Sequence, residues 1–195
     1  MKLVLDNDRK LAVVVISHAR LALLPQVVGS TEGVDELLVI ADGIEDAGFP
    51  FLNVAPITRT TIDALTKRDA GWAATTSDAV LFLSDDHRLA PGFLAAYRDR
   101  YQSRDDWDIL CPSRYTVRGQ SIIPLNVGQA GGYVGGHAGI YRRRCAQLLP
   151  WTAGPHHLNW DLLHTHELIR KGARLVYADT DLAVEDIEPG AEPWR

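Results

Sequence analysis

Three continuous apolar runs are the feature that most constrains how this chain can fold. Residues 11–16 read Leu-Ala-Val-Val-Val-Ile, residues 36–41 read Glu-Leu-Leu-Val-Ile-Ala, and residues 79–83 read Ala-Val-Leu-Phe-Leu. A strand that is buried on both faces of a parallel sheet is apolar along its whole length, whereas apolar and polar residues alternate in a strand with one solvent-exposed face. We therefore expect these runs to form parallel strands at the centre of a sheet.

Segments with helical periodicity separate the apolar runs. Leu24 and Val27 recur at helical spacing between the first two runs, and residues 60–76 carry an apolar helical face before the third. Residues 51–57 predict a short strand, and Pro91 is expected in the first turn of a helix, where its missing N–H is not needed. Alternating strands and helices predict an α/β domain with a right-handed, mostly parallel sheet.

The alternation of apolar strand runs and helical segments is less regular after residue 101. The expected elements there are three short strands and one helix, at residues 108–112, 120–124, 175–177 and 159–171. Gly172 suits the C-terminal end of that helix. Residues 128–139 hold six of the chain's sixteen glycines, which predicts a mobile functional loop, and the chain from residue 179 onward is expected to be irregular.

Length and composition bound the class of protein. A chain of 195 residues suits one domain, and 46% hydrophobic with 23% charged residues excludes a disordered chain. The 25 acidic and 20 basic residues give a net charge of −5, which argues against nonspecific nucleic-acid binding. Only Cys111 and Cys145 are present, so we expect a reducing, cytoplasmic location. No apolar run approaches the ~20 residues of a membrane helix, so no membrane span is expected.

Polar residues follow three of the expected parallel strands. Ser17 follows the first, Asp42 ends the second, and Asp85 and Asp86 follow the third. The carboxyl ends of parallel strands meet at one edge of the sheet, where ligands of open α/β folds bind. Two adjacent carboxylates there favour a divalent cation such as Mg²⁺ or Mn²⁺. The alternatives are an Asx turn at Asp42 and an acidic turn before a helix at Asp85 and Asp86.

These strand ends resemble those of a known enzyme family, the GT-A-fold nucleotide-sugar glycosyltransferases of the family-2 type. The resemblance runs from Leu11 to about Tyr177, most of the chain. It implies a single GT-A, Rossmann-like α/β domain whose mostly parallel central sheet is flanked by helices. The nucleotide- and metal-binding half would occupy about residues 1–100 and the acceptor half about residues 101–195.

The resemblance also implies roles in binding the donor. Ser17 and Asp42 would contact the nucleotide, and Asp85 would face the ribose or the metal. The segment Thr-Lys-Arg-Asp-Ala-Gly-Trp, residues 66–72, is similar to an Arg/Asn-rich segment of the family that approaches the nucleotide. It gives Arg68, or its neighbour Lys67, a base or phosphate contact. The alternative is a solvated helix face.

Metal ligands follow from the same resemblance. The run Leu-Ser-Asp-Asp-His, residues 83–87, looks like the family's Asp-x-Asp or Asp-Asp motif, with Asp86 as the ligand of Mn²⁺ or Mg²⁺. His87 lies beside it, and Glu185 and Asp186 fall where related enzymes often place a third ligand. Each of these three could instead be a surface polar residue.

The acceptor side is implied by two later segments. The glycine-rich stretch leads through His137 to Ile-Tyr-Arg-Arg, residues 140–143, whose arginines either meet phosphate or coat a helix. Asn159, Trp160 and Asp161 resemble the family's acidic segment, in which an Asp of inverting members is the general base. Asn159 stands at the usual base position and cannot accept a proton, so Asp161 is the candidate base. This departure leaves the stereochemistry of transfer open.

The sequence thus predicts a metal-dependent glycosyltransferase that moves a sugar from a nucleotide diphosphate sugar to an acceptor hydroxyl. The acceptor could be a protein, a glycan or a modified base. One alternative is a nucleotidyltransferase of similar fold, although Ser-His-Ala-Arg at residues 17–20 replaces the glycine-rich loop of that group. The other is a catalytically degenerate nucleotide-sugar-binding module, which Asn159 favours.

Overall fold

The computed structural model describes residues 9–17, 22–42, 51–54, 61–117, 120–122, 139–154, 160–179 and 182–187. Its strands are β1 (Leu11–Ile16), β2 (Glu36–Asp42), β3 (Phe51–Val54), β4 (Ala79–Ser84), β5 (His87–Leu89), β6 (Ile109–Cys111), β7 (Arg114–Val117), β8 (Gln120–Ile122), β9 (Ile140–Arg142), β10 (Leu175–Tyr177) and β11 (Ala183–Asp186). Its helices are α1 (Leu24–Gly29), α2 (Thr61–Ala74), α3 (Phe93–Arg100), α4 (Arg143–Leu148), α5 (Trp160–Arg170) and the short 3-10 helix η1 (Trp151–Ala153).

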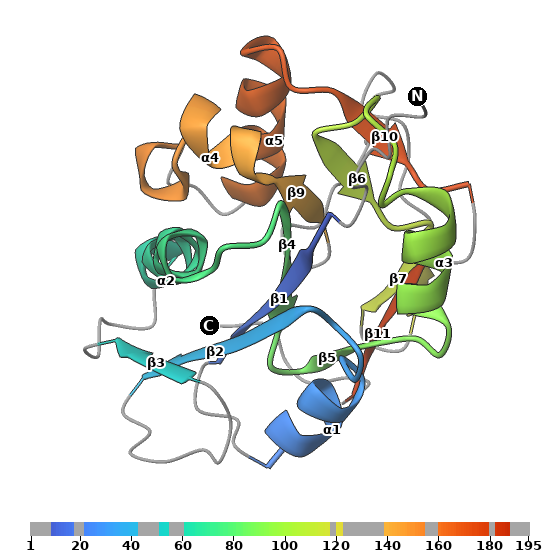
Figure 1. Ribbon diagram of the computed structural model, residues 1–195. Helices are drawn as coiled ribbons and strands as arrows, with labels where there is room; N and C mark the ends of the chain where they lie inside the picture. Colours follow the sequence, from blue (N-terminus) through green and yellow to red (C-terminus); the bar gives the residue numbers. More distant parts are fainter. Residues whose placement is uncertain are drawn as a thin grey trace, which may run out of the picture.

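Within the described ranges, the main sheet has seven strands in the order β10-β6-β9-β4-β1-β2-β3 (Figure 1). β1 pairs in parallel with β2 and with β4, and β2 pairs in parallel with β3. β9 runs antiparallel between β4 and β6. The prediction of a mostly parallel α/β sheet is therefore confirmed.

Helices cover both faces of this sheet, which explains why β1 is apolar along its length. Leu11, Val13 and Val15 belong to a core with residues of α1 and α3, whereas Val14 and its alternate neighbours belong to a core with α2, η1 and α5 (Figure 1). Gly71 lets α2 lie close to β1, because a Cβ at Gly71 would come within 2.8 Å of a Val14 methyl carbon. The sequence around α2 thus sets its distance from the sheet.

A second sheet lies beside the first, in the order β5-β11-β7-β8. The expectation of an irregular chain from residue 179 onward is wrong for Ala183–Asp186, because β11 pairs antiparallel with β5 and parallel with β7. Residues 183–186 carry too short a pattern to be recognised as a strand, and among the described residues β5 pairs with a strand almost a hundred residues away. This sheet holds the chain just after the Asp85-Asp86 pair.

Two further expectations can be compared with the structure. α3 begins at Phe93, after Gly92 with φ of 84°, so Pro91 lies in the preceding turn rather than inside the helix. Gly172 follows α5 with φ of 92°, the left-handed conformation expected of a C-terminal glycine.

Cys111 and Cys145 are both free and buried. No helix in the described segments has the length and apolar character needed to cross a membrane.

Candidate active site

Ser17 and Asp85 lie side by side at the carboxyl ends of β1 and β4. The Ser17 N–H donates to the Ile40 carbonyl oxygen at 2.8 Å, and the Asp85 N–H donates to the Ile16 carbonyl oxygen at 3.2 Å, so the sheet bonding continues past the strand ends. The Ser17 hydroxyl donates to Asp85 Oδ2 at 3.0 Å. Both residues are buried. The structure thus brings together two of the residues that the sequence assigns to the donor.

Lys67 reaches the same strand end from α2. Its Nζ donates to the Ser17 carbonyl oxygen at 2.8 Å, and the side chain is buried. The alternative of a solvated helix face is wrong for this pair of residues, because Arg68 is also only 3% exposed. Of the two basic residues, the structure places Lys67 against the Ser17–Asp85 pair.

Asp86 and His87 form the next contact along the chain. His87 Nδ1 lies 2.6 Å from Asp86 Oδ1, and the Asp86 side chain is 19% exposed, so solvent reaches this carboxylate. The Ile187 N–H donates to the Asp86 carbonyl oxygen at 2.7 Å, which ties the turn to the end of β11. Unlike the buried Asp85, Asp86 can meet a ligand from outside.

β11 brings the two late acidic residues to this turn on opposite faces. In the antiparallel pairing of β11 with β5, Asp186 lies opposite His87 and Glu185 opposite Arg88. Directly opposed residues share a face of the sheet, and successive residues alternate between faces. Glu185 forms an ion pair with Arg88 at 3.1 Å. Asp186 is therefore better placed than Glu185 to join Asp86 and His87.

The Asp86–His87 contact fits a divalent metal only as part of a site. Among the described residues, no group of three or more His, Cys, Asp or Glu side chains is arranged to hold a metal ion. A carboxylate oxygen and an imidazole nitrogen are nonetheless ligands that Mn²⁺ accepts, and Mg²⁺ often takes only one or two protein carboxylates and fills its sphere with phosphate oxygens and water. The donor set suits an ion that arrives with a diphosphate.

Several sequence-assigned residues can be placed only in part. Asp42 ends β2 at the same sheet edge as Ser17, and Trp160 begins α5, but in both cases the backbone alone is described. His137 and Asn159 lie outside the described residues. Their roles stay predictions.

A second group of polar side chains comes from α2, β9 and α5, and we call Arg68, Tyr141, Asp161, His164 and Thr165 the α5 cluster. All five are buried. The Arg68 guanidinium carbon lies 5.6 Å from the Phe82 ring centroid and 5.3 Å from that of Trp151. The His164 ring stacks on the same Trp151 ring, with the two ring centroids 4.0 Å apart. The cluster thus joins α2, β9, η1 and α5.

The charge of Arg68 persists in this setting. Burial lowers the pKa of Arg68 to about 10, while Tyr141 and Asp161 act to raise it. A guanidinium with that pKa is still protonated at neutral pH. Burial also raises the pKa of Tyr141, so its phenol keeps its proton and can donate a hydrogen bond.

Arg142 and Arg143, which the sequence offers as phosphate contacts, bind backbone carbonyls. Arg143 Nε donates to the Ser77 oxygen at 2.9 Å and its Nη1 to the Trp72 oxygen at 3.0 Å. Arg142 Nε donates to the Trp107 oxygen at 3.0 Å. The structure therefore favours a role in holding the backbone over a phosphate contact for both arginines.

His164 makes the stability of the fold sensitive to acid. Burial lowers the pKa of His164 to about 4, below its usual 6.5. As the pH falls, the histidine of the unfolded chain takes up its proton before that of the folded chain. The free energy of unfolding is therefore unaffected by His164 above about pH 6.5 and decreases between about pH 6.5 and 4. Below that range the loss amounts to about 3 kcal/mol. The His164→Phe variant should lose less stability than the wild type between pH 7.5 and 4.5, as measured by urea unfolding. The exposed His166→Gln variant serves as the control, and equal losses in wild type and His164→Phe would contradict the assignment.

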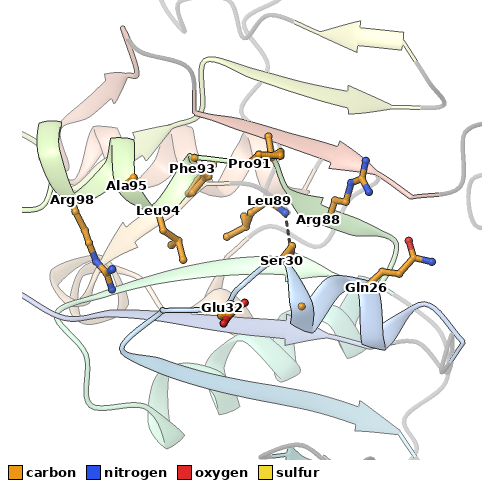
Figure 2. A pocket seen from close by; sticks show the side chains of 13 residues that line it. Gln26, Ser30, Glu32, Arg88, Leu89, Pro91, Phe93, Leu94, Ala95 and Arg98 are labelled. Atoms are coloured by element: carbon orange, nitrogen blue, oxygen red, sulfur yellow. Dashed lines mark hydrogen bonds between the residues drawn. The ribbon is translucent and has the colours of Figure 1, made fainter.

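A separate groove of about 700 Å³ lies between α1, β5 and the start of α3 (Figure 2). Its lining includes Ser30, whose hydroxyl accepts the Leu89 N–H at 3.0 Å, together with Arg88 and Arg98. Of the residues that the sequence assigns to the donor, the metal or the acceptor, none whose side chain the structure describes lines this groove. It is distinct from the strand-end site.

Comparisons with known proteins identify the fold. No protein-family model matches the sequence, and no curated protein matches it significantly. Among solved structures, S. aureus TarS has a TM-score of 0.65 at 14% identity over 91% of this chain and 60% of its own. The mannosyltransferase PcManGT from Pyrobaculum calidifontis, in complex with GDP-Man and Mn²⁺, has a TM-score of 0.63 at 13% identity over 93% of this chain and 58% of its own.

A further match is glucosyl-3-phosphoglycerate synthase from Mycobacterium tuberculosis, with a TM-score of 0.58 at 16% identity over 95% of this chain and 74% of its own. This chain spans about 60% of the length of the TarS and PcManGT chains. At these identities the likeness shows the fold, which is of the GT-A type, as the resemblance in the sequence implies.

Proposed function

We propose that this protein is a metal-dependent glycosyltransferase that moves a sugar from a nucleoside diphosphate sugar to an acceptor hydroxyl. The observation that carries the proposal is the strand-end site, where Ser17 bonds Asp85 and Asp86 contacts His87 at the edge of a GT-A-type sheet. Ligands of open α/β sheets bind at this edge. Solved structures of the same fold include complexes with UDP-GlcNAc, with UDP, and with GDP-Man and Mn²⁺.

On the donor side, Ser17, Asp42 and Asp85 would hold the nucleoside. The Ser17–Asp85 bond and the Lys67 contact fix the backbone where the nucleotide would lie. Asp86, with His87 and Asp186 beside it, would hold Mn²⁺ or Mg²⁺. A divalent ion there would neutralise the charge that develops on the departing diphosphate.

On the acceptor side, Asp161 would act as the general base. Its carboxylate would take the proton of the acceptor hydroxyl as that oxygen attacks the anomeric carbon, and the diphosphate would leave with the electrons of the broken C–O bond. Asn159 cannot do this, because an amide does not accept a proton near neutral pH. A catalytically degenerate nucleotide-sugar-binding module is the second candidate, and Asn159 is the observation that favours it.

A thermal-shift screen separates these proposals from an unrelated function. Nucleoside diphosphates and their sugars, with uridine and guanosine forms first, are added with and without Mn²⁺. A ligand at roughly 100 times its Kd stabilises the fold by about 2.7 kcal/mol. We expect a shift that requires Mn²⁺, and the absence of any shift across the set would contradict nucleotide-sugar binding. Transfer or hydrolysis of the labelled sugar then distinguishes the enzyme from the module.

A further inference from the structure

Lys67 is a buried cation at the carboxyl end of β1. Its side chain is fully buried, and its Nζ donates to the Ser17 carbonyl oxygen at 2.8 Å. Lysine is almost never buried to this degree, because its ammonium group loses its hydration. The family resemblance gives Lys67 or Arg68 a contact with the base or the phosphates of the donor. The structure instead joins Lys67 to the main chain of the protein.

The packing of α2 against β1 brings Lys67 to this position. Gly71 follows Lys67 by four residues and therefore shares its face of the helix. A Cβ at Gly71 would come within 2.8 Å of a Val14 methyl carbon, so Gly71 lies beside the middle of β1. Lys67, one helical turn earlier, then lies beside Ser17 at the end of the strand. The close approach of the helix thus lets the lysine reach the strand end.

Ser17 is the residue where three elements meet α2. Its N–H donates to the Ile40 carbonyl oxygen of β2 at 2.8 Å, and its hydroxyl donates to Asp85 Oδ2 at 3.0 Å, directly after β4. Asp42 ends β2 two residues after Ile40. A shift of Ser17 would therefore be transmitted to the ends of β1, β2 and β4.

Lys67 and Asp85, in their ionised forms, place opposite charges on either side of Ser17. Both side chains are fully buried; the Ser17 carbonyl oxygen accepts from Lys67, and the Ser17 hydroxyl donates to Asp85. Buried charges are weak evidence for stability, because apolar side chains that pack well in their place are often as stable. Their presence is better explained by what they hold in place, which is the end of β1.

We propose that Lys67 is a positioning residue of the donor site, which acts through Ser17 and contacts neither the base nor the phosphates of the donor. This inference rests on the proposed function, which places the nucleoside at the ends of β1, β2 and β4. Lys67 holds the main chain of Ser17 to α2, while the Ser17 hydroxyl holds Asp85. Without the ammonium group, the spacing of the strand ends is less closely fixed.

Donor affinity tests this role. The Lys67→Met variant keeps the length of the side chain and removes the ammonium group. We expect its Kd for UDP and for UMP in Mn²⁺ to rise by the same factor, about 10-fold, as for the loss of one hydrogen bond to a charged group. The factors are equal because both ligands share the nucleoside that the strand ends would hold. Titration calorimetry measures each Kd, and GDP with GMP is the second pair of probes.

Two further measurements accompany these titrations. The exposed Lys171→Met variant makes the same chemical change outside the site and should leave each Kd unchanged. In Lys67→Met, kcat at saturating donor should stay within about twofold of the wild type, because a positioned donor site is restored once the donor is bound. If Lys67→Met does not fold, Lys67→Gln replaces it, and we expect a rise in Kd of about threefold because the amide still donates a hydrogen bond.

A double-mutant cycle tests whether Lys67 acts through Ser17. Ser17→Ala removes the hydroxyl that binds Asp85 but keeps the carbonyl group that accepts from Lys67. We expect the double variant to lose less affinity for UDP than the product of the two single losses, because either change alone breaks the same connection. The same cycle is measured by urea unfolding of the ligand-free protein at pH 7.5, where the shifts in midpoint should be non-additive.

The outcomes separate this inference from the proposed function. A loss confined to UDP would make Lys67 a phosphate ligand, and independent losses in the double-mutant cycle would show that it acts without Ser17; either result would overturn the inference alone. A lower unfolding midpoint with unchanged Kd would leave Lys67 only a structural role and would also overturn it. A wild-type protein that binds no nucleotide would overturn the proposed function and the donor-site role of Lys67 together.

Discussion

The Asp86→Ala variant is expected to lose the metal-dependent part of nucleoside diphosphate binding. Asp86 carries the solvent-accessible carboxylate of the strand-end site, whereas Asp85 is buried against Ser17. Removing one partner of a charged contact commonly costs 2–5 kcal/mol, so we expect the Kd in Mn²⁺ to rise by about 100-fold, or about 2.8 kcal/mol. The Kd is measured by titration calorimetry with and without Mn²⁺.

The control for this variant is Asp99→Ala on α3. Asp99 is 76% exposed and pairs only with Arg100 among its described neighbours, so the same chemical change is made at a distance from the strand ends. It should leave the Kd unchanged. If Asp86→Ala binds the nucleotide as tightly as the wild type, and chelation of Mn²⁺ makes no difference to either protein, Asp86 is not the metal ligand.

The Asp161→Asn variant should lose turnover and keep its affinity for the donor. Asparagine has nearly the shape of aspartate but cannot take the proton of the acceptor hydroxyl. General-base catalysis contributes about 10²- to 10⁴-fold, so kcat should fall by that factor at saturating donor. The Kd for the nucleoside diphosphate should stay near that of the wild type, because the proposed donor contacts are made by residues at the ends of β1, β2 and β4.

Glu167→Gln on the same helix is the matched control. Glu167 pairs with the exposed Arg170 one turn later, so its replacement removes a charge from α5 and leaves every side chain of the α5 cluster in place. An unchanged kcat in Asp161→Asn would exclude Asp161 as the base. The anomeric configuration of the product would then show whether transfer retains configuration, and Glu185 and Asp186 would be the next carboxylates to replace.

Local pattern predicts the parts of the site that lie directly after long strands. Ser17, Asp42, Asp85 and Asp86 were all assigned to one sheet edge because parallel strands end together, and the pairing of β1 with β2 and β4 places them there. The same reasoning could not choose between Lys67 and Arg68. Adjacent residues of a helix point in different directions, and only packing shows which direction leads to Ser17.

The α5 cluster was only partly accessible to sequence reasoning. Asp161 was recognised through its family resemblance, but nothing in the pattern around Tyr141 distinguishes a residue that packs against Trp151 beside α5 from any other core aromatic. Thr165 carried no signal beyond its position one turn after Asp161. These residues meet because β9 runs antiparallel between β4 and β6 and presents Tyr141 to α2, η1 and α5.

The sequence by itself determined the central strands, because a strand that is apolar along its whole length is stable only when helices cover both faces of its sheet. It also determined which polar residues follow those strands. Only the tertiary structure decided the second sheet, since β5 and β11 are too short to be stable without each other. It also decided that Asp186 lies opposite His87 while Glu185 lies opposite Arg88, and that Arg68 lies against the Trp151 ring. Those outcomes depend on contacts between residues far apart in the chain, which no local pattern encodes.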